Sequence, residues 1–109
     1  MNCNNVLIME DDVIFKDNPL ERLNNFMEAV PEDWGQIYLG GQHRRHPKKT
    51  EDPNVIIGSS VNRTHAYAVN APTLTALYRH ISYATDYRGS TKHIDHQLEL
   101  AHQRCDWPV

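Results

Sequence analysis

The chain has 109 residues, of which 39% are hydrophobic and 23% are charged, and its formal net charge is −3. This length allows one domain with a modest hydrophobic core, and the composition is that of an ordinary globular protein. The acidic balance argues against nucleic acid or an anionic membrane as partner. No apolar run approaches the ~20 residues that span a bilayer. We therefore expect one domain that neither binds nucleic acid nor spans a membrane.

The two cysteines, Cys3 and Cys105, lie near opposite ends of the chain. Their spacing matches neither a C-x-x-C motif nor a disulfide framework, so we expect both thiols to be reduced. The N-terminus lacks the basic and then hydrophobic segments of a signal peptide. A cytoplasmic location is the expectation that follows.

Residues 6–9, Val-Leu-Ile-Met, form a β-prone run that is followed directly by Glu10, Asp11 and Asp12. Such a run is typical of a strand buried on both faces, and the acids then lie at its carboxyl end, where open α/β sheets bind ligands. Neighbouring carboxylates repel one another, which a cation relieves, and oxygen ligands suit Mg²⁺ or Mn²⁺. The alternative interpretation is a solvated strand end with aspartates in capping roles.

Three segments have the apolar spacing of amphipathic helices. The first spans about 19–30 and begins at an Asn18-Pro19 pair, which supplies an N-cap and a proline at the first helical position. The second spans about 71–82 and the third about 93–103. The predicted buried positions are Leu20, Leu23, Phe26, Met27 and Val30 in the first helix, Leu74, Leu77, Tyr78 and Ile81 in the second, and Ile94, Leu98 and Ala101 in the third.

Strands and loops are expected between the first two helices. A short strand over 36–39 ends at Gly40 and Gly41, where the backbone can turn or approach a ligand closely. A polar, basic surface loop follows, and then two strands over 55–61 and 64–69 that a turn separates. These elements predict a mixed α/β domain.

Four of these segments, in this order, resemble glycosyltransferase family 25, which includes lipopolysaccharide and collagen galactosyltransferases. They are 6–13 (VLIMEDDV), 37–41 (IYLGG), 64–69 (THAYAV) and 94–98 (IDHQL), and the match runs over nearly the whole chain. The resemblance implies a partial GT-A-like fold, a Rossmann-related mixed sheet with about three helices. It also implies that residues 1–109 correspond to the C-terminal, metal- and acceptor-binding part of such an enzyme and lack most of the nucleotide-binding half.

The activity that the resemblance implies is metal-dependent transfer of a hexose from a nucleoside diphosphate sugar to a saccharide hydroxyl, with inversion. Glu10 and Asp12 would occupy the outer positions of the metal motif, with Asp11 between them, and Mn²⁺ or Mg²⁺ would neutralise the leaving diphosphate. Asp95 matches the family's helix acid, the candidate for the base that deprotonates the acceptor hydroxyl. Its alternative role is a first-turn acid favoured by the helix dipole.

The remaining candidate residues come from the strands. Gly40 and Gly41 would let the backbone approach the bound donor sugar or the acceptor, and a plain strand end is the alternative. In the family, Thr64, His65 and Tyr67 would line the substrate site, although an alternating pair such as His65 and Tyr67 is also typical of half-buried packing. The basic loop could close over a diphosphate or be a solvated loop.

Other classes of function stay open. One is a non-catalytic α/β binding or assembly module, in which exposed sheet edges drive formation of a homo-oligomer. Another is a receiver domain of a response regulator, whose first strand the VLIMEDD run also resembles, but the strand over 36–39 ends without a phosphoacceptor aspartate. His93 and His96 suggest zinc, for which third and fourth ligands are not evident. A chain without the nucleotide pocket is expected to have little activity by itself.

Overall fold

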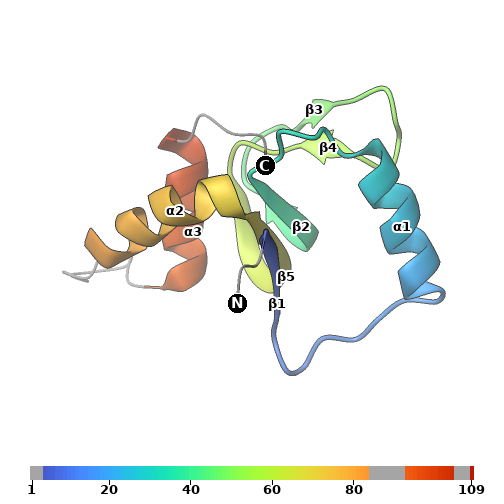
Figure 1. Cartoon of the computed structure of the whole chain (residues 1–109), viewed down its shortest axis with the longest axis horizontal. Helices are drawn as coiled ribbons and strands as arrows, with labels where there is room; N and C mark the ends of the chain where they lie inside the picture. Colours follow the sequence, from blue (N-terminus) through green and yellow to red (C-terminus); the bar gives the residue numbers. More distant parts are fainter. Residues whose placement is uncertain (1–3, 84–92, 105–108) are drawn as a thin grey trace.

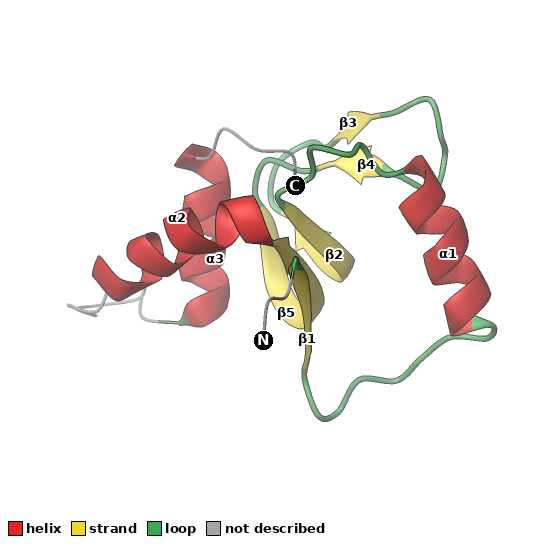
Figure 2. Cartoon of the chain, viewed as in Figure 1, coloured by secondary structure: helices red, strands yellow, loops and turns green. Residues whose placement is uncertain are grey.

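The computed structural model describes residues 4–83, 93–104 and 109. Cys3 and Cys105, expected to be reduced, lie outside these residues. Within the described residues, the chain is a small mixed α/β domain with three helices and a three-stranded antiparallel sheet (Figure 2), which confirms the expected class. The elements are β1 (Asn5–Met9), α1 (Pro19–Ala29), β2 (Gln36–His43), β3 (Lys48–Lys49), β4 (Ile56–Ile57), β5 (Val61–Asn70), α2 (Ala71–Tyr83) and α3 (Ile94–Arg104).

The three-stranded sheet has the order β1-β5-β2, and both outer strands run antiparallel to β5. Leu7 lies opposite Ala68 in one pair, and Tyr38 lies opposite Tyr67 in the other. The expectation that β1 is buried on both faces is wrong, because β1 is an edge strand and its side chains are exposed. Helices α2 and α3 lie beside the sheet and contact β5 (Figure 1).

The sequence predicted that the strand over 36–39 ends at the two glycines. In the structure, β2 continues through them to His43. Its pairing with β5 shifts register between Tyr38 and Gly40, and again between Gly40 and Gln42. Glycine weakens a strand without ending it, and is typical of bulges. The glycines therefore mark an irregularity inside the sheet.

Asn62 and Arg63, predicted to form a turn, lie within strand β5, which is ten residues long. Of the strand predicted over 55–61, only Ile56, Ile57 and Val61 lie in strands. Arg63 has φ of 82°, in the left-handed region. The register shift between the Gly40–Ala66 and Gln42–Asn62 pairs places this irregularity within the paired strand and not in a turn between two strands. The polar segment before β5 also contains structure, because β3 and β4 pair as a two-stranded sheet.

Helix α1 begins at Pro19, as expected, but Asn18 adopts φ of 53° and makes no side-chain capping bond. None of its residues is buried, and Leu20 is 75% exposed. The predicted apolar stripe is therefore only partly covered: Leu23, Phe26 and Val30 are half-buried, and α1 lies apart from α2 and α3 (Figure 1). Apolar spacing predicts a helix, but it does not specify what covers the helix.

Helices α2 and α3 pack with β5 to form the hydrophobic core. The Asn70 side chain accepts a bond of 2.9 Å from the Ala71 N–H at the start of α2. Leu74 and Tyr78 are exposed, contrary to expectation, and so is Ile94 of α3. The buried core cluster is Val69, Leu77, Leu98 and Ala101, with Tyr67 and Ile81 packed against it. No helix in the described part of the chain has the length and hydrophobicity needed to cross a membrane.

Candidate functional site

A polar pocket of about 350 Å³ lies between α3 and the irregular part of the sheet. It is lined by Gln42, Arg44, Asn62, Arg63, Asp95, His96, Glu99 and Leu100. Its volume is near the lower end of the ~300–1,000 Å³ that small-molecule sites occupy. Asp95, the predicted base, thus lines a pocket of a size that could hold a small ligand.

Asp95 lies in the first turn of α3 and is half-buried. Its Oδ1 accepts a hydrogen bond of 2.9 Å from the backbone N–H of His96. Its Oδ2 accepts no hydrogen bond from any described residue. One carboxylate oxygen is therefore oriented by the helix, while the other can accept a proton or a hydrogen bond from a ligand.

Glu99, which the sequence did not single out as a site residue, lies one helical turn after Asp95 and lines the same pocket. Its Oε1 accepts a bond of 2.6 Å from Ser60 Oγ, and its Oε2 accepts one of 2.9 Å from Asn62 Nδ2. Burial acts to raise the pKa of Glu99, but these two bonds and the charge of Arg44 hold it below its usual value. The i, i+4 spacing from Asp95 was the sequence signal for this residue.

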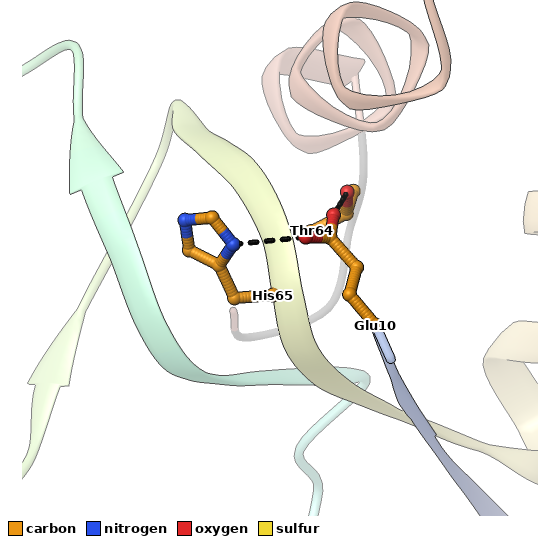
Figure 3. A network of polar contacts seen from close by, with 3 residues as sticks. All are labelled: Glu10, Thr64 and His65. Carbon is orange, nitrogen blue, oxygen red and sulfur yellow. Dashed lines mark hydrogen bonds and ion pairs between the residues drawn. The ribbon is translucent and has the colours of Figure 1, made fainter. Parts of the chain in front are cut away.

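A second polar cluster forms where the acidic segment after β1 meets β5 (Figure 3). Glu10 Oε1 accepts a bond of 2.6 Å from Thr64 Oγ1, and Oε2 lies 3.0 Å from His65 Nδ1. The bond from Thr64, and then that from His65, lowers the pKa of the Glu10 carboxyl. The backbone N–H of Glu10 also donates to the His65 carbonyl at 2.9 Å. Three of the predicted site residues are thus in direct contact.

The predicted metal ligands offer oxygen atoms without forming a closed cage. Asp11 and Asp12 are exposed in the turn after β1. In the part of the chain that the structure describes, no group of three or more His, Cys, Asp or Glu side chains is arranged to hold a metal ion. Mg²⁺ sites often take only one or two carboxylates and complete their shell with substrate phosphates. Each Glu10 oxygen already faces one partner, Thr64 or His65, and retains a further lone pair.

The other predicted residues lie away from the polar pocket. Gly40 and Gly41 line a mainly apolar cavity of about 190 Å³ beside β2, β4 and the end of α1. Tyr67 is half-buried, and its ring stacks on Tyr38 with centroids 5.8 Å apart. Tyr67 thus packs against a specific neighbour, Tyr38, as the half-buried packing interpretation expects.

His102 of α3 is a buried histidine that sequence reasoning missed. It is 4% exposed, and its ring nitrogens contact the Tyr38 hydroxyl at 3.0 Å and the Val61 N–H at 3.2 Å. Burial lowers the pKa of His102 to about 4, so the imidazole is neutral at neutral pH. These contacts attach α3 to both β2 and β5.

Residues 62–65 of β5 connect the two polar clusters. Asn62 and Arg63 line the pocket of Asp95, and the next two residues contact Glu10. Comparisons of the chain with protein-family models, curated proteins and solved structures found no match. The interpretation of the site therefore depends on this geometry and on the sequence resemblance.

Proposed function

We propose that the chain is the metal- and acceptor-binding part of a GT-A-like, cytoplasmic glycosyltransferase that transfers a hexose from a nucleoside diphosphate sugar to a saccharide hydroxyl. One observation carries this proposal: residues 62–65 of β5 bring the pocket of Asp95 next to the cluster of Glu10. An inverting transfer needs a base at the acceptor hydroxyl and compensation of charge at the leaving diphosphate. The two clusters supply candidates for both roles.

Asp95 is the base in this proposal. The acceptor oxygen forms a bond to the anomeric carbon, the bond from that carbon to the diphosphate oxygen breaks, and the hydroxyl proton passes to Asp95. Oδ2 is the candidate atom, because Oδ1 already accepts the bond from the His96 N–H. A carboxylate serves as a base when it lies within hydrogen-bond reach of the hydroxyl.

Glu10 and Asp12 are the candidate ligands of the cation, with Asp11 between them. When bound, Mg²⁺ or Mn²⁺ would offset the charge that develops on the diphosphate. The contacts with Thr64 and His65 hold the Glu10 carboxylate against β5 and so orient the start of the acidic segment. Thr64 and His65 are thus positioning residues for the proposed metal site.

The experiment that tests this proposal is calorimetric titration of the purified chain with Mn²⁺, and then with uridine diphosphate in the presence of Mn²⁺. Asp12→Ala should abolish the metal binding. Asp33→Ala, which removes an exposed carboxylate outside the site, should retain it. Asp95→Asn should also retain it, because that residue is assigned to the acceptor. A wild-type chain that binds no Mn²⁺ would reject the metal assignment.

A non-catalytic assembly module is the second candidate function, and exposed apolar surface favours it. The four apolar side chains of residues 6–9 on edge strand β1 are 37% to 47% exposed. Unpaired strand edges with apolar side chains favour association with another chain. A monodisperse dimer that binds neither Mn²⁺ nor uridine diphosphate would support this candidate over the first.

A further inference from the structure

We propose that the saccharide acceptor of the Asp95 pocket carries an anionic group, a carboxylate or a phosphate, which binds Arg63 together with Arg44. This inference rests on the proposed function and narrows its acceptor to charged sugars. It concerns the chemistry of the pocket and does not involve the metal ligands. It can therefore be tested by binding alone.

Two arginines, Arg44 and Arg63, line the pocket together with the carboxylates of Asp95 and Glu99. Both oxygens of Glu99 already accept bonds, from Ser60 and Asn62. The one ion pair within residues 4–83, 93–104 and 109 joins His65 and Glu10, so neither pocket arginine has a carboxylate at ion-pair distance there. An arginine guanidinium binds a carboxylate or phosphate in a bidentate manner. An incoming anion would supply the missing partner.

The backbone of Arg63 gives a second, independent indication. Its φ of 82° is uncommon for any residue other than glycine, asparagine or aspartate. The conformation is held from both sides, because Asn62 is bound by Glu99 and Thr64 is bound by Glu10. Such strained residues cluster at binding sites. Arg63 is thus an exposed cation held at the rim of the pocket.

The remaining lining favours a sugar with one acidic group over a diphosphate. Gln42 and Asn62 contribute amides, which suit hydroxyl groups. Asp95 and Glu99 contribute carboxylates, which would repel a ligand with several negative charges. A sugar with hydroxyls and one acidic group matches this mixture of partners.

The test is a set of amide chemical-shift titrations of the full chain with glucuronate, glucose 6-phosphate and glucose. The two anionic sugars should bind at least about tenfold more tightly than glucose, because charge-assisted bonds are stronger than neutral ones. The comparison of glucuronate with glucose 6-phosphate identifies whether a carboxylate or a phosphate is preferred. Pyrophosphate is then added as a competitor.

Arg63→Asn is the informative variant, because asparagine tolerates the left-handed conformation while the substitution removes the guanidinium group. It should lower the affinity for the anionic sugars about tenfold and leave glucose binding unchanged. Arg45→Asn is the matched control: Arg45 is exposed near Arg44 but does not line the pocket. Arg44→Gln, measured in parallel, keeps the test decisive if Arg63→Asn does not fold.

Three results would overturn the inference: no sugar binds, the three sugars bind equally, or the pocket variants behave like Arg45→Asn. Stronger binding of pyrophosphate that displaces glucuronate would also overturn it, because the arginines would then serve a diphosphate. The Mn²⁺ titration separates the two proposals. Arginine-dependent sugar binding without Mn²⁺ binding would support the anion site and reject the glycosyltransferase assignment. Mn²⁺ binding without arginine-dependent sugar binding would reject only the anion site.

Discussion

The backbone N–H of Val61 donates a hydrogen bond of 3.2 Å to Nδ1 of His102. Because Nδ1 accepts this bond, the neutral ring carries its proton on Nε2, which lies 3.0 Å from the Tyr38 hydroxyl. Burial lowers the pKa of His102 to about 4, and a second proton would also face the Val61 donor. A neutral histidine therefore joins α3 to the sheet.

Acidification should destabilise the fold through His102. The unfolded chain takes up this proton near pH 6.5 and the folded chain only near pH 4, so the unfolded state binds more protons between these values. The free energy of unfolding should therefore decrease by up to ~3 kcal/mol as the pH is lowered through this window. Urea denaturation at about pH 7 and about pH 4 measures the change.

His102→Gln is the control for the pH experiment. The lowered pKa values of Glu10 and Glu99 also make the protein less stable as the pH is lowered, but they act in both proteins. The variant should therefore show a shallower dependence than wild type. Identical dependence in the two proteins would contradict a neutral, buried His102.

Removal of the Glu99 side chain should loosen the attachment of α3 to β5. Glu99→Ala leaves the Ser60 hydroxyl and the Asn62 amide without their acceptor, and both of these residues are buried. We expect a loss of about 1–3 kcal/mol in the free energy of unfolding, measured with urea. Glu28→Ala, at an exposed glutamate of α1, should change it by less than about 0.5 kcal/mol. Equal effects of the two substitutions would show that the bonds of Glu99 to Ser60 and Asn62 do not stabilise the fold.

The two glycines of β2 should respond differently to alanine. A Cβ at Gly41 would lie 2.7 Å from Val61 Cγ1 and 3.3 Å from the Asn62 carbonyl, whereas a Cβ at Gly40 meets nothing within 4 Å. Gly41→Ala should therefore cost about 1–3 kcal/mol, through overpacking against β5. Gly40→Ala is the matched control and should be close to neutral in thermal denaturation. A neutral Gly41→Ala would show that β5 moves easily.

The exposed apolar edge of the sheet should make the chain associate. Leu7 is 44% exposed in edge strand β1, and we expect association that rises with protein concentration in sedimentation experiments. Leu7→Lys should shift the population toward monomer, because a charge on an edge strand opposes strand pairing. Leu74→Lys, at a similarly exposed leucine of α2, should have no such effect. Association that is unchanged by Leu7→Lys would place the contact elsewhere.

Local patterns in the sequence predicted the helices and the first strand. Pro19 and Asn70 mark the starts of α1 and α2, and residues 6–9 lie within β1. These features depend on neighbouring residues only, since helix starts and β-prone runs are set by nearby side chains and backbone conformation. The same patterns did not predict burial. The exposed Tyr78 on α2, at 69%, shows that apolar spacing does not specify which positions a neighbouring element covers.

The same division between local sequence and tertiary packing applies to the candidate site. The acidic run and its resemblance singled out Glu10 and Asp95 from the sequence, and the structure places Glu10 against Thr64 and His65. Glu99 and His102 acquired their roles only from the tertiary structure. Their partners are Val61 and Asn62 of β5 and Ser60, which directly precedes that strand, and all three are far from α3 in the sequence. Only the packing of α3 on β5 brings them within hydrogen-bond distance. The sequence by itself thus determined the local elements and the candidate acids, whereas long-range packing decided which polar groups meet, because burial and pairing depend on the whole fold.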